Sequence, residues 1–253
     1  MAPTFRHGKG ARLAVNAKRF DRVLNDMAWK ASVDTADVTV YNSTTGGVGA
    51  EKSKEYLAGH RDASFTMSGL FDGSTERVAE ILNALMGSTT PVQVTWMPDA
   101  SSVGATAVKL IRGRVTAVDV ASPAQGAVSA AFTVQASSKE GLTGFVLRNS
   151  TGTIATSTTN GTAVVLGSTT VGPTTRGGTA HLHVHSKTGG GNLTCRIQHS
   201  SGGAWADHTS FAVVTAATWQ RIALAGSIKE QVRVQHWGSS TGVFDCTVAL
   251  ARY

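Results

Sequence analysis

The sequence predicts a mainly β protein with one short α-helix in its first part and a β-sandwich in its second part. Two observations predict it. Short runs of alternating apolar and polar residues recur along the chain between turns rich in Gly, Ser and Thr, and 28 of the 253 residues are glycine. Helical periodicity is scarce, and one short segment, about 74–86, carries it.

The first elements surround that helix. In the run 63–68, Phe65 and Met67 alternate with Ser and Thr, which predicts a half-buried strand. The helix is predicted from apolar residues at positions 78, 81, 82 and 85, an N-cap at 72–74 and a stop at Gly87. A strand over 91–97 follows it.

A long hairpin closes the first part. Residues 103–120 predict one long strand or a bent pair of strands, with a bulge at Gly113. Residues 122–126 predict a turn, and residues 127–136 the antiparallel mate. A hairpin with such long arms fits a channel-forming hairpin and a plain sandwich hairpin equally well.

The second part is divided from the first by a segment rich in Ser and Thr. We predict a domain at 1–148 with a flexible basic N-terminal arm, a linker or first edge strand at 149–162, and a sandwich domain at 163–253. Seven short strands predict the sandwich: 163–166, 180–186, 193–199, 208–214, 220–223, 230–237 and 243–252.

An ordered set of small motifs in the first part carries a resemblance. The set is Val33-Asp34, Asp37, Thr39, Lys54, Tyr56, Leu57, Gly59, Asp62, Ser68, Gly69, Phe71 and Asp72. It resembles the major tail protein, or tail tube protein, of long-tailed bacteriophages, over roughly residues 15–148. The resemblance implies that this part is a β-sandwich or barrel with one flanking α-helix. The second part is similar, more loosely, to immunoglobulin-like or jelly-roll modules appended to phage tail proteins.

The resemblance implies a virion structural protein assembled in the host bacterial cytoplasm. Copies would form hexameric rings, stacked into a tube through which phage DNA passes, in contact with tape measure, terminator and distal tail proteins. The loop before Lys54 becomes a candidate contact between rings, with Asn42, Thr45, Val48 and Lys52 as its residues. If residues 1–148 build the rings and residues 150–253 only decorate their outside, removing residues 150–253 should spare tube formation.

The formal net charge of +7 lies partly in residues 1–30, without interleaved aromatics or a nucleic-acid module signature. Specific DNA binding is therefore not predicted, and a basic lumen would hold DNA tightly. We expect the N-terminal basic residues to face neighbouring subunits: Arg6, Lys9, Arg12, Lys18, Arg19 and Arg22. No apolar run approaches ~18 residues and residues 1–30 lack an apolar signal core, so we expect cytosolic synthesis without membrane insertion.

Few residues suggest chemistry, and neither an enzyme nor a cofactor is predicted. His181, His183 and His185 share one strand face, either as polar residues facing solvent or an interface, or as a zinc site lacking an identified further ligand. Cys195 and Cys246 fit buried thiols, or a disulfide if their strands are neighbours.

Three tryptophans offer the competing function, a carbohydrate-binding or adhesin-like protein. Trp219 and Trp237 lie within predicted strands, where core or inter-sheet packing is expected. Trp205 lies in a Gly-rich loop and is the candidate sugar contact.

Overall fold

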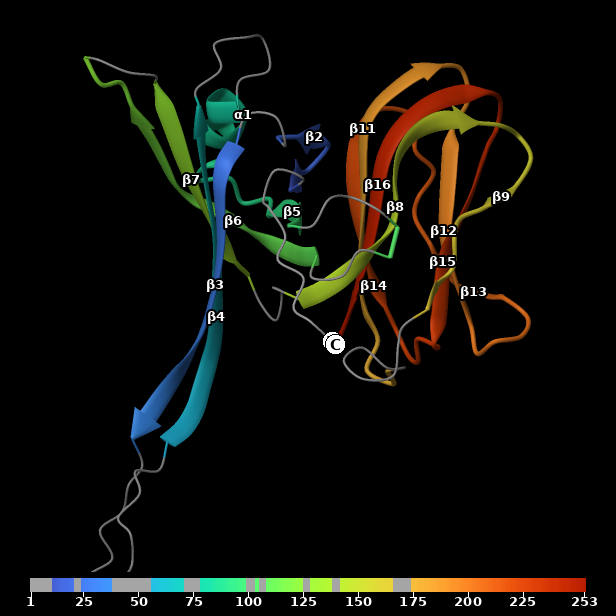
Figure 1. Cartoon of the computed structure of the whole chain (residues 1–253), viewed down its shortest axis with the longest axis horizontal. Coiled ribbons are helices and arrows are strands. Elements are labelled where there is room, and N and C mark those ends of the chain that lie inside the picture. Colours follow the sequence, from blue (N-terminus) through green and yellow to red (C-terminus); the bar gives the residue numbers. More distant parts are fainter. Residues whose placement is uncertain are drawn as a thin grey trace, which may run out of the picture.

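The computed structural model of the protein describes residues 11–20, 24–37, 56–70, 78–98, 103–104, 108–124, 128–137, 142–165 and 174–253. It confirms the mainly β fold with antiparallel sheets (Figure 1). The elements of the first half are β1 (Arg12–Val15), β2 (Lys18–Arg19), β3 (Leu24–Asp37), β4 (Tyr56–Leu70), α1 (Val78–Leu85), β5 (Val92–Met97), β6 (Val108–Ala121) and β7 (Ser129–Ala136). Those of the second half are β8 (Leu142–Ile154), β9 (Thr159–Asn160), β10 (Val164–Val165), β11 (Gly178–Gly189), β12 (Leu193–Ser200), β13 (Ala206–Ser210), β14 (Thr218–Leu224), β15 (Gln231–Gly238) and β16 (Gly242–Arg252).

One large sheet runs through both halves. Strand β6 is the junction, because its first residues pair with β8 and its later residues with β7, while β5 occupies its other edge. From β8 the sheet continues through β16 and β11 to β14. A second sheet, in the order β10-β15-β12-β13 with β9 also on β15, completes the C-terminal sandwich.

Three apolar clusters fill the spaces between these layers. The sandwich core lies between the two sheets of the second half. A second cluster lies in the first half, and the partly buried Ile81 and Leu85 of α1 pack against it. The third joins the halves: Met97, Val108, Leu110, Val146, Ala249 and Ala251 are all buried together. The sandwich sheet is therefore buried on both of its faces where the first half covers it.

The β3–β4 hairpin extends beyond the body of the molecule (Figure 1). Strand β7 pairs with β4 only over Ser64–Leu70, so residues 32–37 and 56–62 pair only with each other. Within the part of the chain that the structure describes, β3 has no partner on its outer edge. This 14-residue strand is a long open sheet edge.

Several expectations for individual elements can be compared with the structure. The alternation at 63–68 is confirmed, because Phe65 and Met67 are buried in β4. The bulge predicted at Gly113 is wrong in position, since the register shift lies between Val115 and Ala117. Gly113 is instead a close approach between strands: a Cβ there would lie 2.2 Å from the Gln135 carbonyl oxygen.

The Ser/Thr-rich segment predicted as a linker or first edge strand is mostly strand. Residues 149–154 complete β8 and pair with β16 from Gly242 to Thr247. Residues 159–160 form β9 against β15. Hydroxyl-bearing residues suit a strand with one solvated face as well as a linker, so composition alone did not separate the two.

Candidate functional site

The histidines of β11 lie in a polar layer between the two halves. Leu182 and Val184 point into the sandwich core, as predicted. His181 and His183 point the other way, toward β5 of the first half, and both are fully buried. Thr95 of β5 lies between the two rings, with its hydroxyl 3.1 Å from His181 Nδ1 and 2.8 Å from His183 Nε2.

The partners of this layer define the tautomers of the two rings. His183 Nδ1 is bonded to the Asn16 carbonyl oxygen, which only accepts, so Nδ1 carries the proton. In the neutral ring Nε2 must then accept, and the Thr95 hydroxyl donates to it. Having given its only proton, the Thr95 oxygen accepts from His181 Nδ1.

Burial keeps both imidazoles neutral. It lowers the pKa of His183 to about 3, an effect partly opposed by the Asn16 carbonyl and reinforced by His185. Burial is also the main reason why the pKa of His181 lies well below its ordinary value, and the neighbouring His183 and Arg221 lower it further.

The arrangement is that of a packing layer. His185 is bonded to the Ala17 carbonyl at 3.0 Å and lies 3.1 Å from the Thr247 hydroxyl, so its partners differ from the Thr95 hydroxyl that His181 and His183 share. In the described part of the chain, no group of three His, Cys, Asp or Glu side chains is placed to hold a metal ion. The structure places His181 and His183 in a buried layer between the two halves of the chain.

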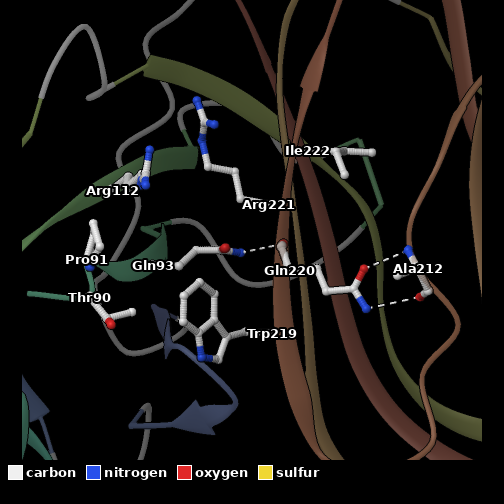
Figure 2. Close-up of a pocket in the computed structure, with 9 residues that line it drawn as sticks. All are labelled: Thr90, Pro91, Gln93, Arg112, Ala212, Trp219, Gln220, Arg221 and Ile222. Carbon is white, nitrogen blue, oxygen red and sulfur yellow. Dashed lines mark hydrogen bonds between the residues drawn. The ribbon is translucent and has the colours of Figure 1, made fainter.

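A cleft of about 620 Å³ opens beside this layer (Figure 2). Its lining comes from both halves: Thr90, Pro91, Gln93, Arg112, Ala212, Trp219, Gln220, Arg221 and Ile222. The Gln220 side chain closes one wall, accepting from the Ala212 N–H at 2.8 Å and donating to its carbonyl at 3.0 Å. The described residues of this lining include two guanidinium groups and no carboxylate, imidazole or thiol.

Two tryptophans expected in the core or in inter-sheet packing are both partly exposed. Trp219 lines the cleft, and Trp237 lies on the outer face of the second sheet, 5.0 Å from the Arg196 guanidinium. Trp205, the candidate sugar contact, lies on the same outer face, 4.2 Å below the Arg233 guanidinium. All three rings are partly exposed. Trp219 lies in β14 and Trp237 in β15, and the alternation of β15 puts Trp237 on the same strand face as Arg233 and Gln235, opposite the core residues Val232 and Val234.

The other candidates divide between described and undescribed parts of the chain. Asn42, Thr45, Val48 and Lys52 lie outside the described residues, as do Arg6, Lys9 and Arg22. Arg19 forms an ion pair with Asp245 of β16 at 3.2 Å, so one basic residue of the N-terminal segment contacts the second half of its own chain.

Cys195 and Cys246 are buried thiols. No described helix is long and apolar enough to cross a bilayer.

Comparisons with known proteins give remote structural similarities only. Neither a protein-family model nor a curated protein sequence matches the chain. A chain in the virion of a native gene transfer agent particle aligns at 18% identity, over 53% of this chain and 95% of its own, with a TM-score of 0.40. A chain in the tail of an empty gene transfer agent particle, refined with C6 symmetry, aligns at 20% identity over 56% and 98%, also at 0.40. The Dit protein of phage SPP1, described as a hub of the adsorption apparatus, aligns at 12% identity over 96% and 99%, with a TM-score of 0.35.

Proposed function

We propose that the protein is a structural subunit of a phage-type tail, located in the virion and without a catalytic role. In this proposal copies of the chain associate into rings, hexameric by resemblance, that stack into a tube for DNA passage. Tape measure, terminator and distal tail proteins would be its other partners. The support comes from the ordered tail-protein motifs at residues 33–72 and from the open edge of β3.

The open edge of β3 is the observation that carries the assembly step. A long unpaired strand edge invites pairing with another chain, and soluble monomers usually block such edges. Here β3 is 14 residues long, it pairs only with β4 among the described strands, and it exposes Val33 at 43%. Closing a ring through such edges would satisfy the unpaired backbone groups of each subunit.

The direct test is electron microscopy of the concentrated, purified chain. Stacked rings forming tubes are the expected result, whereas a chain that stays monomeric at every concentration would contradict the proposal. Rings that never stack would contradict the tube and leave a hub-like ring as the function.

A pair of single substitutions tests the contact surface. Val33→Asp places a charge on the extended hairpin, where a subunit packing against β3 would desolvate it. The protein concentration needed for assembly should therefore rise at least tenfold. Val165→Asp makes the same change on β10 of the sandwich, at 67% exposure, and should leave assembly unchanged. Equal loss in both variants, or in neither, would exclude the β3 surface as the contact.

A further inference from the structure

The outer face of the second sheet carries an ordered polar surface. The register of β12 and β15 pairs Arg196 with Gln235 and Gln198 with Arg233 on this face. The intervening pair, Ile197 with Val234, points into the sandwich core. Every second residue of both strands therefore points away from the sandwich core, and Arg196, Arg233 and Trp237 are among the partly exposed ones.

A chain of hydrogen bonds fixes these side chains in place. Arg233 Nε donates to Gln198 Oε1 at 2.9 Å, and Gln198 Nε2 donates to Asp207 Oδ1 at 2.7 Å. Arg196 bonds to both Gln235 and Asp207, and Gln235 Nε2 donates onward to Asn160 at 2.6 Å. Gln198 and Gln235 are only 6% and 7% exposed. Their rotamers are thus set before any ligand arrives, which reduces the entropy lost on binding.

Two indole rings lie at opposite ends of this network. The Arg233 guanidinium is 4.2 Å from the Trp205 ring and the Arg196 guanidinium 5.0 Å from the Trp237 ring. Positions 233 and 237 are four residues apart on β15, so their Cα atoms lie about 13 Å apart. The loop before Trp205 is held by Ser200 Oγ, which accepts from the N–H groups of Gly202 and Gly203.

The charge of this face is unbalanced. Two guanidinium groups and one carboxylate belong to the network, and Asp207 forms its ion pair with Arg196. No carboxylate among the described residues pairs with Arg233. A ligand for this face should therefore bring an anionic group toward Arg233, where bidentate binding of a carboxylate or phosphate is geometrically favoured.

We propose that this face binds an acidic glycan, a polysaccharide that carries carboxylate or phosphate groups. A sugar ring has polar edges and an apolar face, which match the guanidinium groups and the indole rings respectively. A protein partner would need an apolar centre to its interface, and the outward residues of β12 and β15 include no aliphatic side chain. Nucleic acid would need several phosphate contacts, which a net charge of about one does not supply.

Isothermal titration of the full chain with defined probes tests the proposal. The probes are a glucuronate-containing oligosaccharide, a poly(glycerol phosphate) oligomer, a neutral glucan of similar length and a single-stranded oligonucleotide. We expect at least one acidic polymer to bind at least tenfold more tightly than the neutral glucan, with affinity falling as salt rises. The two acidic arms distinguish carboxylate from phosphate as the recognised group. Equal binding of the neutral glucan, preference for the oligonucleotide, or no binding at millimolar concentration would overturn the proposal.

Matched variants assign the binding to this face. Arg233→Gln and Trp205→Ala should each weaken binding at least tenfold, and Arg233→Lys should recover part of the loss because it keeps the charge. Arg112→Gln and Trp219→Ala make equivalent changes in the cleft and should leave affinity within twofold. Unfolding midpoints check that every variant is folded. Equal losses in the cleft variants would overturn the assignment, which does not depend on assembly of the chain.

Discussion

The buried His183 should make the stability of the protein depend on pH in a way that one substitution removes. Its neutral ring accepts from Thr95 and donates to the Asn16 carbonyl, and protonating Nε2 would leave a charge buried between the halves. The folded-state pKa is about 3, against an ordinary value of 6.5 in the unfolded chain. Between these values the unfolded state binds a proton that the folded state excludes, so stability rises with pH.

The size of the effect follows from the two pKa values. The free energy of unfolding that depends on the neutral state of His183 is almost fully retained at pH 7. It is lost progressively as the pH falls from 6.5 to about 3. From pH 7 to pH 5 the loss in free energy of unfolding is about 2 kcal/mol. His181, His199, His208 and His236 also have lowered pKa values and add losses in the same direction. The difference between wild type and a His183 variant isolates the one residue.

The variant is His183→Gln, studied by urea unfolding at pH 7 and pH 5 on dilute, monomeric protein. We expect a lower stability at pH 7, by about 1–3 kcal/mol for the disturbed hydrogen bonds, and a dependence on pH reduced by about 2 kcal/mol. Ser186→Gln introduces the same amide at an exposed position of β11 and should change neither quantity by more than about 0.5 kcal/mol. An unchanged dependence on pH in His183→Gln would refute the assignment of a neutral buried ring.

Two further features of the second half lead to simple measurements. Gly144→Ala should lower the free energy of unfolding by more than about 2 kcal/mol, because its Cβ would lie 2.2 Å from the Leu250 carbonyl oxygen. The control Gly203→Ala meets no atom within 4 Å and should cost less than about 0.5 kcal/mol. Equal effects of the two variants in chemical denaturation would show that the strands separate easily. Cys195 and Cys246 should resist Ellman's reagent at pH 8 until denaturant is added, because burial raises the pKa of both thiols, and rapid labelling of the native chain would show that the sandwich opens.

Local alternation predicted the strands and their core-facing residues well. Phe65, Met67, Cys195 and Cys246 all lie in a core, as their positions in apolar–polar runs indicated. The helix was also predicted, and α1 occupies Val78–Leu85 within the predicted range. These features depend on neighbours two to four residues away, which the sequence displays directly.

The polar layer between the halves was beyond such reasoning. His181 and His183 alternate with apolar residues in β11, as Gln93 and Thr95 do in β5, and each pattern is typical of a strand with one solvated face. The two faces instead bury each other through hydrogen bonds. A polar strand face looks the same in sequence whether water or another polar face covers it. The signal available in the sequence for this layer was that β5 and β11 both carry side chains with hydrogen-bond donors and acceptors.

The junction changes what can be expected of the second half. Strand β8 begins before residue 148 and continues to Ile154, and the apolar cluster beneath it includes Met97, Val108 and Leu110 of the first half. A chain that lacks residues 150–253 would cut β8 and expose these side chains, so we expect it to be insoluble rather than competent for assembly. A soluble fragment that forms tubes would show that the junction is dispensable. With the junction intact, the sandwich keeps a fixed orientation on its subunit, and its outer sheet is the layer farthest from the β3–β4 hairpin (Figure 1). If β3 forms the contacts between subunits, the glycan-binding face proposed for that sheet therefore stays open in the assembly.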